Sequence, residues 1–448
     1  MPNPMRSPQS TPEITPRART LTKALFSSRI IKSRAVGLDG TRLEAFTSRL
    51  DEECALIERK VLCGTYTFTR YREKLILKGA TRLPRRISIP TVRDRLALRA
   101  ICNLLAEAVP GARSAPPHSY IKAIASLIKG TNEPLSFLRV DVRDFFPSIQ
   151  HNILLSKLKD LGVESLILTQ IQKAIENQTG SAPDYVVSGV GVPQGLSISN
   201  LLASVYMQEF DAEAAKRSVY HRYVDDILVV APSHEITARF KEIHAGLLAL
   251  RLDPHPMGRS GKTEIKRISE GIDYLGYHLT PRKISVRTSS YHRMFKNLSK
   301  VFTHYKYKKN LQQFLFKLNL RITGCVVDGK RKGWLLFFSQ TDDLSQLRYL
   351  DEFVATQCRR VGINPKAADI ARFVKAYHEI RFKGVVNGYI PNFDNFTLEQ
   401  KYVLINNLTG VPFEELDSRS VEVTQADFRN LVAKEVADLE QDVLTAIS

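Results

Sequence analysis

The sequence has few of the features that mark secreted, disulfide-rich or membrane-spanning proteins. Its five cysteines among 448 residues are odd in number and lack a CxxC pair, which favours reduced thiols over a disulfide framework or a zinc site. No apolar run approaches the roughly 18 residues of a membrane-spanning helix. The first 20 residues lack the apolar core of a secretory signal. We therefore expect a cytoplasmic protein without a membrane partner.

Negative charge is scarce relative to positive charge. The chain has 46 Asp and Glu against 65 Lys and Arg, a formal net charge of +19. A chain with this excess repels itself, so the charge usually has a polyanionic partner. Nucleic acid is the leading candidate, because each neutralised phosphate releases counterions and adds affinity. A generally basic soluble protein is the alternative.

The pattern along the chain predicts an α+β fold with two or three subdomains rather than one doubly wound sheet. Residues 1–20, rich in Pro, Ser and Thr, are expected to be disordered. The elements expected from hydrophobic spacing and turn residues are helices over 21–62, β-like runs over 66–90, helices over 93–108 and 151–177, a compact strand pair over 271–287, and mainly helices beyond Tyr291.

One segment, FLRVDVRDFFPSI over 137–149, places a carboxylate within an apolar strand. Val140 and Val142 share one face of this strand, and Asp141 points to the other. An unpaired buried carboxylate is costly. Asp141 is therefore more informative than an acidic residue on the surface.

A second segment, HRYVDDILVVA over 221–231, places Asp225 and Asp226 at the expected tip of a hairpin. Asp pairs are common at turns, so a purely structural role is the simpler explanation of this pair. Carboxylates about 4 Å apart would repel by roughly 4 kcal/mol at an effective dielectric near 20. A fold would keep that repulsion only around a cation, ordinarily Mg²⁺. Two metals about 3.5–4 Å apart can activate a 3′-oxygen and stabilise a leaving pyrophosphate. The spacing permits Asp141 to meet Asp225 across a sheet without requiring it.

These segments resemble the polymerase motifs of reverse transcriptases, in the same order. VDVRDFFPSI is similar to the first motif, GVPQGLSISNLLASVYM from Gly191 to the second, and YVDD to the third. The resemblance extends over roughly 35–287, from AVGLDGT through a fingers-like stretch to IDYLGYHLT, which is similar to the primer grip. It implies a right-hand polymerase of fingers, palm and thumb, with an antiparallel palm sheet and a mostly helical C-terminal extension.

The same resemblance implies the subdomain boundaries. Fingers and palm would occupy 21–290 and a helical thumb and extension 291–410, while the acidic composition of 411–448 indicates a separate acidic helix or tail. That last segment would contact a basic surface of a partner or of this chain, or improve solubility.

Carried over to this sequence, the resemblance implies metal and nucleotide ligands. Asp141, Asp225 and Asp226, with the backbone carbonyl of Val142, would hold two Mg²⁺ ions, for which Mn²⁺ can substitute. Phe146 falls at the steric gate, where a ring would clash with a ribose 2′-hydroxyl and favour deoxynucleotides. A core aromatic is the alternative for Phe146.

Further residues match positions that touch the nucleotide. Gln194 would contact it, and Gly195 would let the backbone approach it. Arg86 matches the fingers arginine that grips the triphosphate through its planar fork, with Lys78 as a companion. Lys262 matches the lysine of the fourth motif, a general acid for pyrophosphate. A plain surface lysine is the alternative for Lys262.

The C-terminal third resembles the extension of defence-associated bacterial reverse transcriptases of the unknown groups, closest to the class-3 systems and more distantly similar to retron and group II intron enzymes. Its segments are LNLRITG from Leu318, VKAYHEIRF from Val374 and GYIPNFDNF from Gly388. We expect Tyr377 and His378 to lie on a packed helix face.

The resemblance implies an antiphage RNA-directed DNA polymerase that copies an RNA template into DNA from dNTPs. A non-coding RNA would be its partner, and a second defence protein is a further candidate partner. The alternatives are an untemplated or protein-primed DNA polymerase on the same palm, and a catalytically inactive RNA-binding scaffold.

Overall fold

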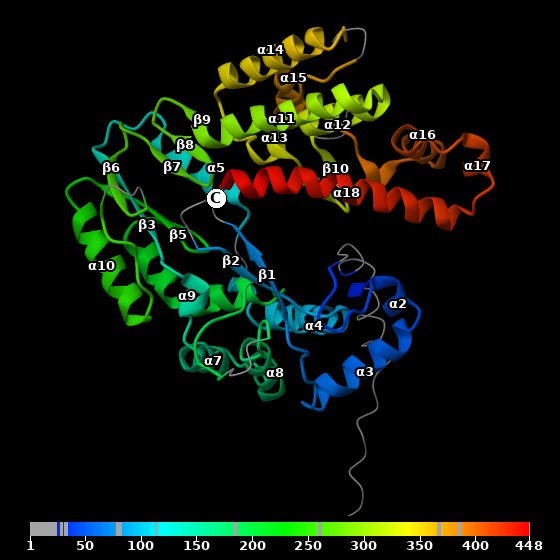
Figure 1. Cartoon of the computed structure of the whole chain (residues 1–448). Coiled ribbons are helices and arrows are strands. Elements are labelled where there is room, and N and C mark those ends of the chain that lie inside the picture. The colour runs from blue at the N-terminus through cyan, green and yellow to red at the C-terminus, as the bar shows by residue number, and fades with distance from the viewer. Residues whose placement is uncertain are drawn as a thin grey trace, which may run out of the picture. The chain divides into compact units, whose positions relative to one another are not determined.

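The computed structural model describes residues 25–447 apart from 27–29, 31–34, 78–82, 113–114, 182–185, 259–261, 365–368 and 384–387 (Figure 1). The N-terminal segment expected to be disordered and the candidate Lys78 therefore lie outside the described residues. None of the helices in the described ranges has the length and apolarity that a lipid bilayer requires.

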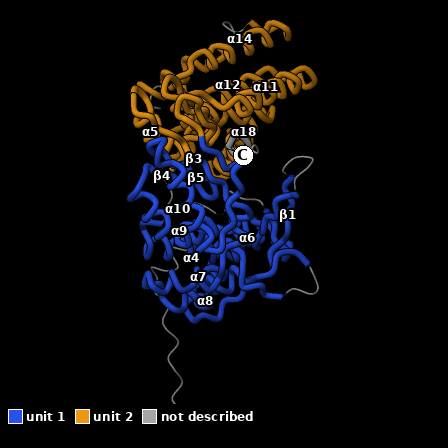
Figure 2. Tube along the Cα trace, turned by 90° about the vertical axis from the view of Figure 1, so that its left-hand side faces the viewer, with its two compact units in different colours: residues 1–114, 138–265 blue, residues 115–137, 266–448 orange. Residues whose placement is uncertain are grey.

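The chain forms two compact units, and neither is a continuous stretch of sequence (Figure 2). The first unit is drawn from residues 1–114 and 138–265, and the second from 115–137 and 266–448. These units are not the subdomains expected from the sequence, whose boundaries at residues 290 and 410 stay predictions.

The first unit combines helices with a two-stranded ribbon and most of a four-stranded sheet. Its elements are α2 (Leu43–Thr47), α3 (Leu50–Leu62), β1 (Arg72–Ile76), β2 (Arg85–Ile89), α4 (Val92–Ala108), α6 (Phe145–Ser148), α7 (His151–Asp160), α8 (Ser165–Ile175), α9 (Ser199–Arg217), β4 (Val219–Tyr223), β5 (Asp226–Pro232) and α10 (Ile236–Ala249), with β3 (Leu135–Asp141) and β6 (Glu264–Arg267) at its boundary.

A four-stranded sheet with the order β4-β5-β3-β6 is the centre of this unit. The strands β4 and β5 form an antiparallel hairpin in which Tyr223 pairs with Asp226. Strand β3 is buried along most of its length, from Leu135 to Leu138 and again at Val140, because its apolar residues occupy both faces. Strands β1 and β2 pair separately as an antiparallel ribbon.

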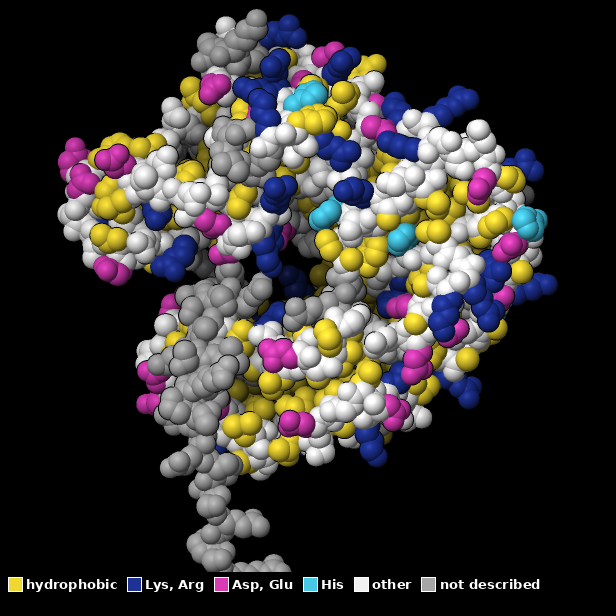
Figure 3. Space-filling model, turned by 180° about the vertical axis from the view of Figure 1, so that it is seen from behind, with side chains coloured by type: hydrophobic (Ala, Val, Ile, Leu, Met, Phe, Trp, Pro, Cys, Tyr) yellow, Lys and Arg dark blue, Asp and Glu magenta, His cyan; other side chains and the backbone are white. Residues whose placement is uncertain are grey.

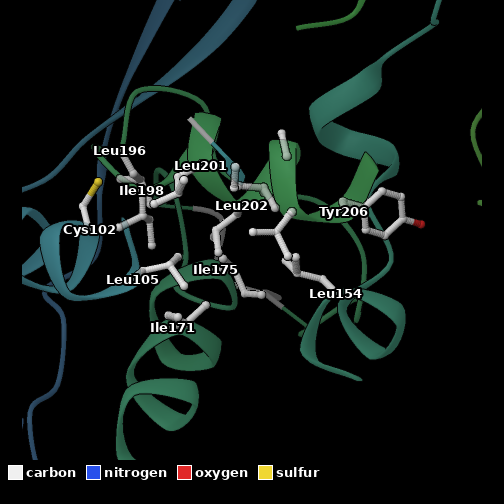
Figure 4. Packing of buried hydrophobic residues seen from close by; sticks show 14 of the residues in the cluster. Cys102, Leu105, Leu154, Ile171, Ile175, Leu196, Ile198, Leu201, Leu202 and Tyr206 are labelled. Atoms are coloured by element: carbon white, nitrogen blue, oxygen red, sulfur yellow. The ribbon is translucent and has the colours of Figure 1, made fainter. Parts of the chain in front are cut away.

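Helices α4, α7, α8 and α9 contribute to one continuous core (Figure 4). Leu105 of α4, Leu154 of α7 and Leu202 of α9 are fully buried in it. Each fully buried aliphatic side chain of this kind contributes about 1.5–3 kcal/mol. The core therefore fixes the helix α9, and with it the Gly/Pro loop that precedes α9.

The second unit is mainly helical. Its elements are α5 (Pro117–Ile128), β7 (Ile272–Tyr274), β8 (Tyr277–Leu279), β9 (Ile284–Val286), α11 (Thr288–Lys308), α12 (Leu311–Thr323), β10 (Cys325–Val327), β11 (Lys330–Lys332), α13 (Trp334–Phe337), α14 (Leu344–Arg360), α15 (Phe373–His378), the π-helix η3 (Glu379–Lys383), the 3₁₀-helix η4 (Phe393–Asn395), α16 (Leu398–Thr409), α17 (Phe413–Asp417) and α18 (Val421–Ile447).

The last helix, α18, packs against the basic helices of its own unit. Phe428, Val432, Val436 and Leu439 lie in one buried cluster, at the spacing of one helix face. On α18, Asp442 accepts hydrogen bonds from Asn297 (2.8 Å) and Arg321 (2.7 Å). The acidic segment therefore contacts a surface of this chain that includes Arg321.

The α+β class, the antiparallel sheets and the helical C-terminal region agree with the sequence-based prediction. The compact strand pair expected over 271–287 is a three-stranded antiparallel sheet, β7-β8-β9. Tyr377 is buried as expected and donates to the carbonyl of Thr341 (2.8 Å). The expectation for His378 was wrong, because its side chain is exposed.

Candidate active site

The β4–β5 hairpin presents Asp225 at a strained turn. Between the paired residues Tyr223 and Asp226, the loop consists of Val224 and Asp225. Val224 has φ 59°, a left-handed conformation that is rare for a β-branched residue. Such strain costs of order 1–3 kcal/mol and persists only where the surroundings enforce it.

Strand β3 meets this turn where Asp141 ends the strand. The backbone amide of Val142 donates to the carbonyl of Asp225 at 3.1 Å. This hydrogen bond joins the residue after Asp141 directly to the backbone of Asp225. Burial raises the pKa of Asp225 to about 6, with the charge of Asp141 as the second cause and that of Asp226 as a smaller one. The structure thus brings Asp141 and Asp225 together, which the sequence permitted without requiring.

Asp226 is engaged differently from Asp225. Arg139 of β3 binds it through two hydrogen bonds of 2.8 Å each, a bidentate ion pair with both side chains largely buried. Burial lowers the pKa of Arg139, but the charge and hydrogen bonds of Asp226 outweigh it and raise that pKa overall. Breaking such a buried pair typically costs 3–5 kcal/mol, so Asp226 is firmly held.

Asp141 is contacted by two groups from the loop after α10. Lys262 Nζ lies 2.5 Å from Asp141 Oδ2 and 2.9 Å from His255 Nε2, while His255 lies 3.4 Å from the same carboxylate oxygen. Burial, followed by the charge of Lys262, lowers the pKa of His255, and Asp141 opposes that shift. Lys262 is therefore part of the site rather than a plain surface lysine.

The donor set suits a divalent metal completed by substrate. Among the described residues, no group of three or more His, Cys, Asp and Glu side chains could by itself hold a metal ion. Asp141 and Asp225 nevertheless supply two hard oxygen ligands side by side. Mg²⁺ is usually held by one or two carboxylates together with substrate phosphates and water, so these residues fit it.

Strand β2 lies against the Gly/Pro loop. The amide of Ser88 donates to the carbonyl of Gln194 at 2.7 Å. Gly195 has φ 106°, and a Cβ at this residue would lie 2.7 Å from the carbonyl oxygen of Ser88. The close contact with β2 requires a glycine here, whatever part Gly195 plays in nucleotide binding.

The two arginines of β2 have different surroundings. Arg86 binds Glu73 of β1 (2.6 Å) and the carbonyl of Thr179. The charge of Arg85 acts on Asp225 and lowers its pKa, against the larger effects of burial and Asp141. Successive strand residues face opposite ways, and of the two arginines it is Arg85 whose charge affects the pKa of Asp225.

The adjacent phenylalanines of α6 also differ. Phe145 is buried in the core, with 3% of its surface exposed. Phe146 is only partly buried against that core, and its ring centroid lies 5.5 Å from that of Phe145. Its carbonyl accepts from the amide of Val192 (2.8 Å), which joins it to the Gly/Pro loop.

Three site residues escaped the sequence analysis: Arg85, Arg139 and His255. Arg139 could have been found from strand periodicity, because it shares a face with Asp141 two residues later. Alternation puts Arg85 and Arg86 on opposite faces of β2, but it does not say which of them faces the carboxylates. No local pattern identifies His255, which reaches Asp141 only through the path of its loop.

Comparison with known proteins decides the class of this site. Residues 76–279 match the family model described as "Reverse transcriptase (RNA-dependent DNA polymerase)". The chain carries a reverse transcriptase domain. This domain makes the protein an RNA-directed DNA polymerase, a nucleotidyltransferase, and its matched range includes every candidate site residue named above. The match does not extend to the defence-associated subgroup.

The individual proteins that this chain resembles are distant. "Protein YkfC" of Escherichia coli (strain K12) is 22% identical over 299 residues, with 55% of this chain and 76% of that protein covered. A telomerase from Candida albicans in complex with a "TWJ fragment of telomeric RNA" gives a TM-score of 0.46 at 14% identity, with 84% of this chain and 68% of that chain covered. Apo telomerase from Candida tropicalis gives 0.43 at 12% identity, with 81% and 69% covered.

Proposed function

We propose that this reverse transcriptase extends a 3′-hydroxyl with dNTPs on an RNA template, with Asp141 and Asp225 as its principal metal ligands. The observation that carries the proposal is the buried position of Asp225 beside Asp141: burial, and then the charge of Asp141, raise the pKa of Asp225 to about 6. A fold retains such a destabilised carboxylate where a cation or reaction requires it.

A divalent metal bound here would polarise the attacking hydroxyl and neutralise charge on the triphosphate. The protein supplies the surrounding contacts. Lys262, which contacts Asp141, would donate a proton to the leaving pyrophosphate. Arg85, and Arg86 if it leaves Glu73, would bind the triphosphate oxygens. Gln194 and Phe146 would border the incoming sugar.

Asp226 has a conditional part in this proposal. Its carboxylate is held by Arg139 through both oxygens. It would join Asp141, Asp225 and the carbonyl of Val142 as a ligand when that ion pair opens, or through the lone pairs that Arg139 leaves free. Until then, its role is to fix the turn that positions Asp225.

The test is DNA synthesis by the purified protein with Mg²⁺ and labelled dNTPs, with and without added RNA. RNA-dependent product is expected from the wild type and from Asp160→Asn, a matched control at the exposed end of α7. Asp141→Asn and Asp225→Asn should each reduce the rate at least about a thousandfold, as loss of several kcal/mol of electrostatic stabilisation implies. Equal activity of Asp225→Asn and wild type would refute the assignment.

The same assay separates the other chemistries. Product that is made without RNA and that survives RNase treatment would indicate untemplated or protein-primed synthesis. No product with any template or metal, including Mn²⁺, would favour an RNA-binding scaffold.

We further propose that the enzyme acts in antiphage defence with a non-coding RNA as template and partner. The support is the similarity of its C-terminal segments to defence-associated enzymes and its net charge of +19. Sequencing RNA that co-purifies with Asp225→Asn protein should give one enriched transcript. Wild-type cells, but not Asp225→Asn cells, should restrict phage plating. Equal plating on both strains would contradict a catalytic role in defence.

A further inference from the structure

We infer that the second unit carries a binding platform for single-stranded RNA. It consists of the stacked rings of His378 and Phe382 and a basic cavity that begins at Arg381. All of these residues belong to the second unit and lie outside the carboxylate site.

An aromatic pair, His378 at the end of α15 and Phe382 of the π-helix η3, is exposed to solvent. Tyr377 near the end of α15 is buried, as are Glu379 and Ile380 at the start of η3, whereas Phe382 is 70% exposed. The rings of His378 and Phe382 are stacked, with centroids 5.6 Å apart and planes 26° apart. An exposed phenylalanine gains little for folding, and π-helical turns frequently occur at functional sites.

A cavity of about 540 Å³ lies beside this pair. Arg331 and Lys332 of β11, Arg381 of η3 and His118 of α5 line it, with Glu440 as its acidic residue. Glu440 forms an ion pair with Lys332, and Arg381 Nη1 donates a hydrogen bond to the side-chain oxygen of Gln340 at 3.0 Å. The remaining charge is positive, and Arg381 joins the cavity to the aromatic pair.

Single-stranded RNA fits this combination. An exposed ring face accepts a base by stacking, which is available only where bases are not already stacked in a duplex. Arginines one or a few nucleotides away bind phosphate oxygens through a bidentate fork. Lys and Arg side chains lie among hydrophobic ones on the part of the surface that the second unit forms (Figure 3).

RNA rather than DNA is the expected occupant, because the proposed function, on which this inference rests, uses an RNA template that must be partly single-stranded. The binding test needs no catalysis, so its failure and that of the proposed function are distinguishable. A platform outside the carboxylate site would hold template or partner RNA while the primer end moves.

The test measures binding of a fluorescent 12-nucleotide oligouridylate to the full chain without dNTPs or metal. Phe382→Ala should weaken binding about tenfold, the loss of one stacked base, and Arg331→Glu should weaken it similarly. Phe382→Trp should restore binding. The matched controls are Tyr349→Ala, an exposed ring on α14, and Arg359→Glu on the same helix; both should bind as wild type. Ultraviolet cross-links should map to 378–382.

Three outcomes would overturn the proposal. Unchanged binding by Phe382→Ala, with no cross-link in 378–382, would exclude the platform. Equal loss in Tyr349→Ala would mean a diffuse effect of the unit. Equal or tighter binding of an RNA duplex, or of oligodeoxythymidylate of the same length, would exclude single-stranded RNA as the occupant. Circular dichroism identifies a misfolded variant, for which Phe382→Trp supplies the alternative measurement.

Discussion

At the scale of single residues, Asp225 is a carboxylate whose ionised form is less stable in the folded chain than in the unfolded chain. Its pKa is raised from 3.8 to about 6 by burial and by Asp141. The unfolded chain therefore loses this proton at lower pH than the folded chain does. As a result, ionisation of Asp225 lowers the free energy of unfolding of the metal-free protein as pH rises from about 4 through 6.

Asp225→Asn should consequently stabilise the metal-free protein at pH 8. We expect a gain of about 1–3 kcal/mol in the free energy of unfolding, from a shift of about two pKa units, and little gain near pH 4. Denaturant unfolding with a chelator at both pH values measures this difference, with Asp160→Asn as the control. A gain of the same size at both pH values would show that the carboxylate charge is not its source.

Phe145 and Phe146 offer a matched pair of substitutions. Phe146→Ala should raise incorporation of rNTPs relative to dNTPs about tenfold or more, since it removes the ring proposed to meet the 2′-hydroxyl. Phe145→Ala should instead lower the free energy of unfolding by about 3–5 kcal/mol through a core cavity, without a change in sugar preference. Single-nucleotide incorporation kinetics and denaturant unfolding provide the two readouts. An unchanged rNTP preference in Phe146→Ala would favour the core-aromatic interpretation.

At the scale of elements, α18 depends on a buried polar contact as well as its apolar face. Asp442 is 9% exposed and binds Arg321 and Asn297. Asp442→Ala should destabilise the second unit by about 3–5 kcal/mol, because it leaves the Arg321 charge without its carboxylate in a buried position. Proteolysis of the folded protein should then cut within α18. Glu422→Ala, at the exposed start of the helix, is the control and should leave the cleavage pattern unchanged.

The elements themselves were largely predictable, whereas their partners were not. Strand β3, the β4–β5 hairpin and helices α4, α7 and α8 follow from apolar spacing and turn residues, which are local properties. The choice between Arg85 and Arg86 required the path of β2. The approach of His255 to Asp141 required a loop conformation, and the inclusion of α5 in the second unit required contacts distant in sequence. His378 is exposed between the buried Tyr377 and Glu379, and apolar spacing alone does not show which of these neighbours faces solvent.

At the scale of the whole molecule, the excess positive charge predicts the response to salt. If the protein contacts about six RNA phosphates, raising monovalent salt from 50 to 200 mM should weaken binding of a single-stranded template roughly 10²- to 10³-fold. The contact of Lys262 with Asp141 is partly buried and should respond much less. Template affinity measured across this range, beside Arg331→Glu, tests the estimate. A shallow dependence in the wild type would indicate that the net charge serves another purpose.

The contact of Gly195 with Ser88 also limits how this enzyme can be engineered. A library meant to broaden the substrates of this polymerase toward unnatural nucleotides would diversify the residues around the nucleotide pocket. At position 195 any added side chain would meet a strand's main chain, at 2.7 Å from its carbonyl oxygen, rather than empty space. Most variants with a side chain at position 195 would lose the close packing of the Gly/Pro loop against β2. Substitutions are therefore better placed at Gln194 and Phe146, with Gly195 kept constant.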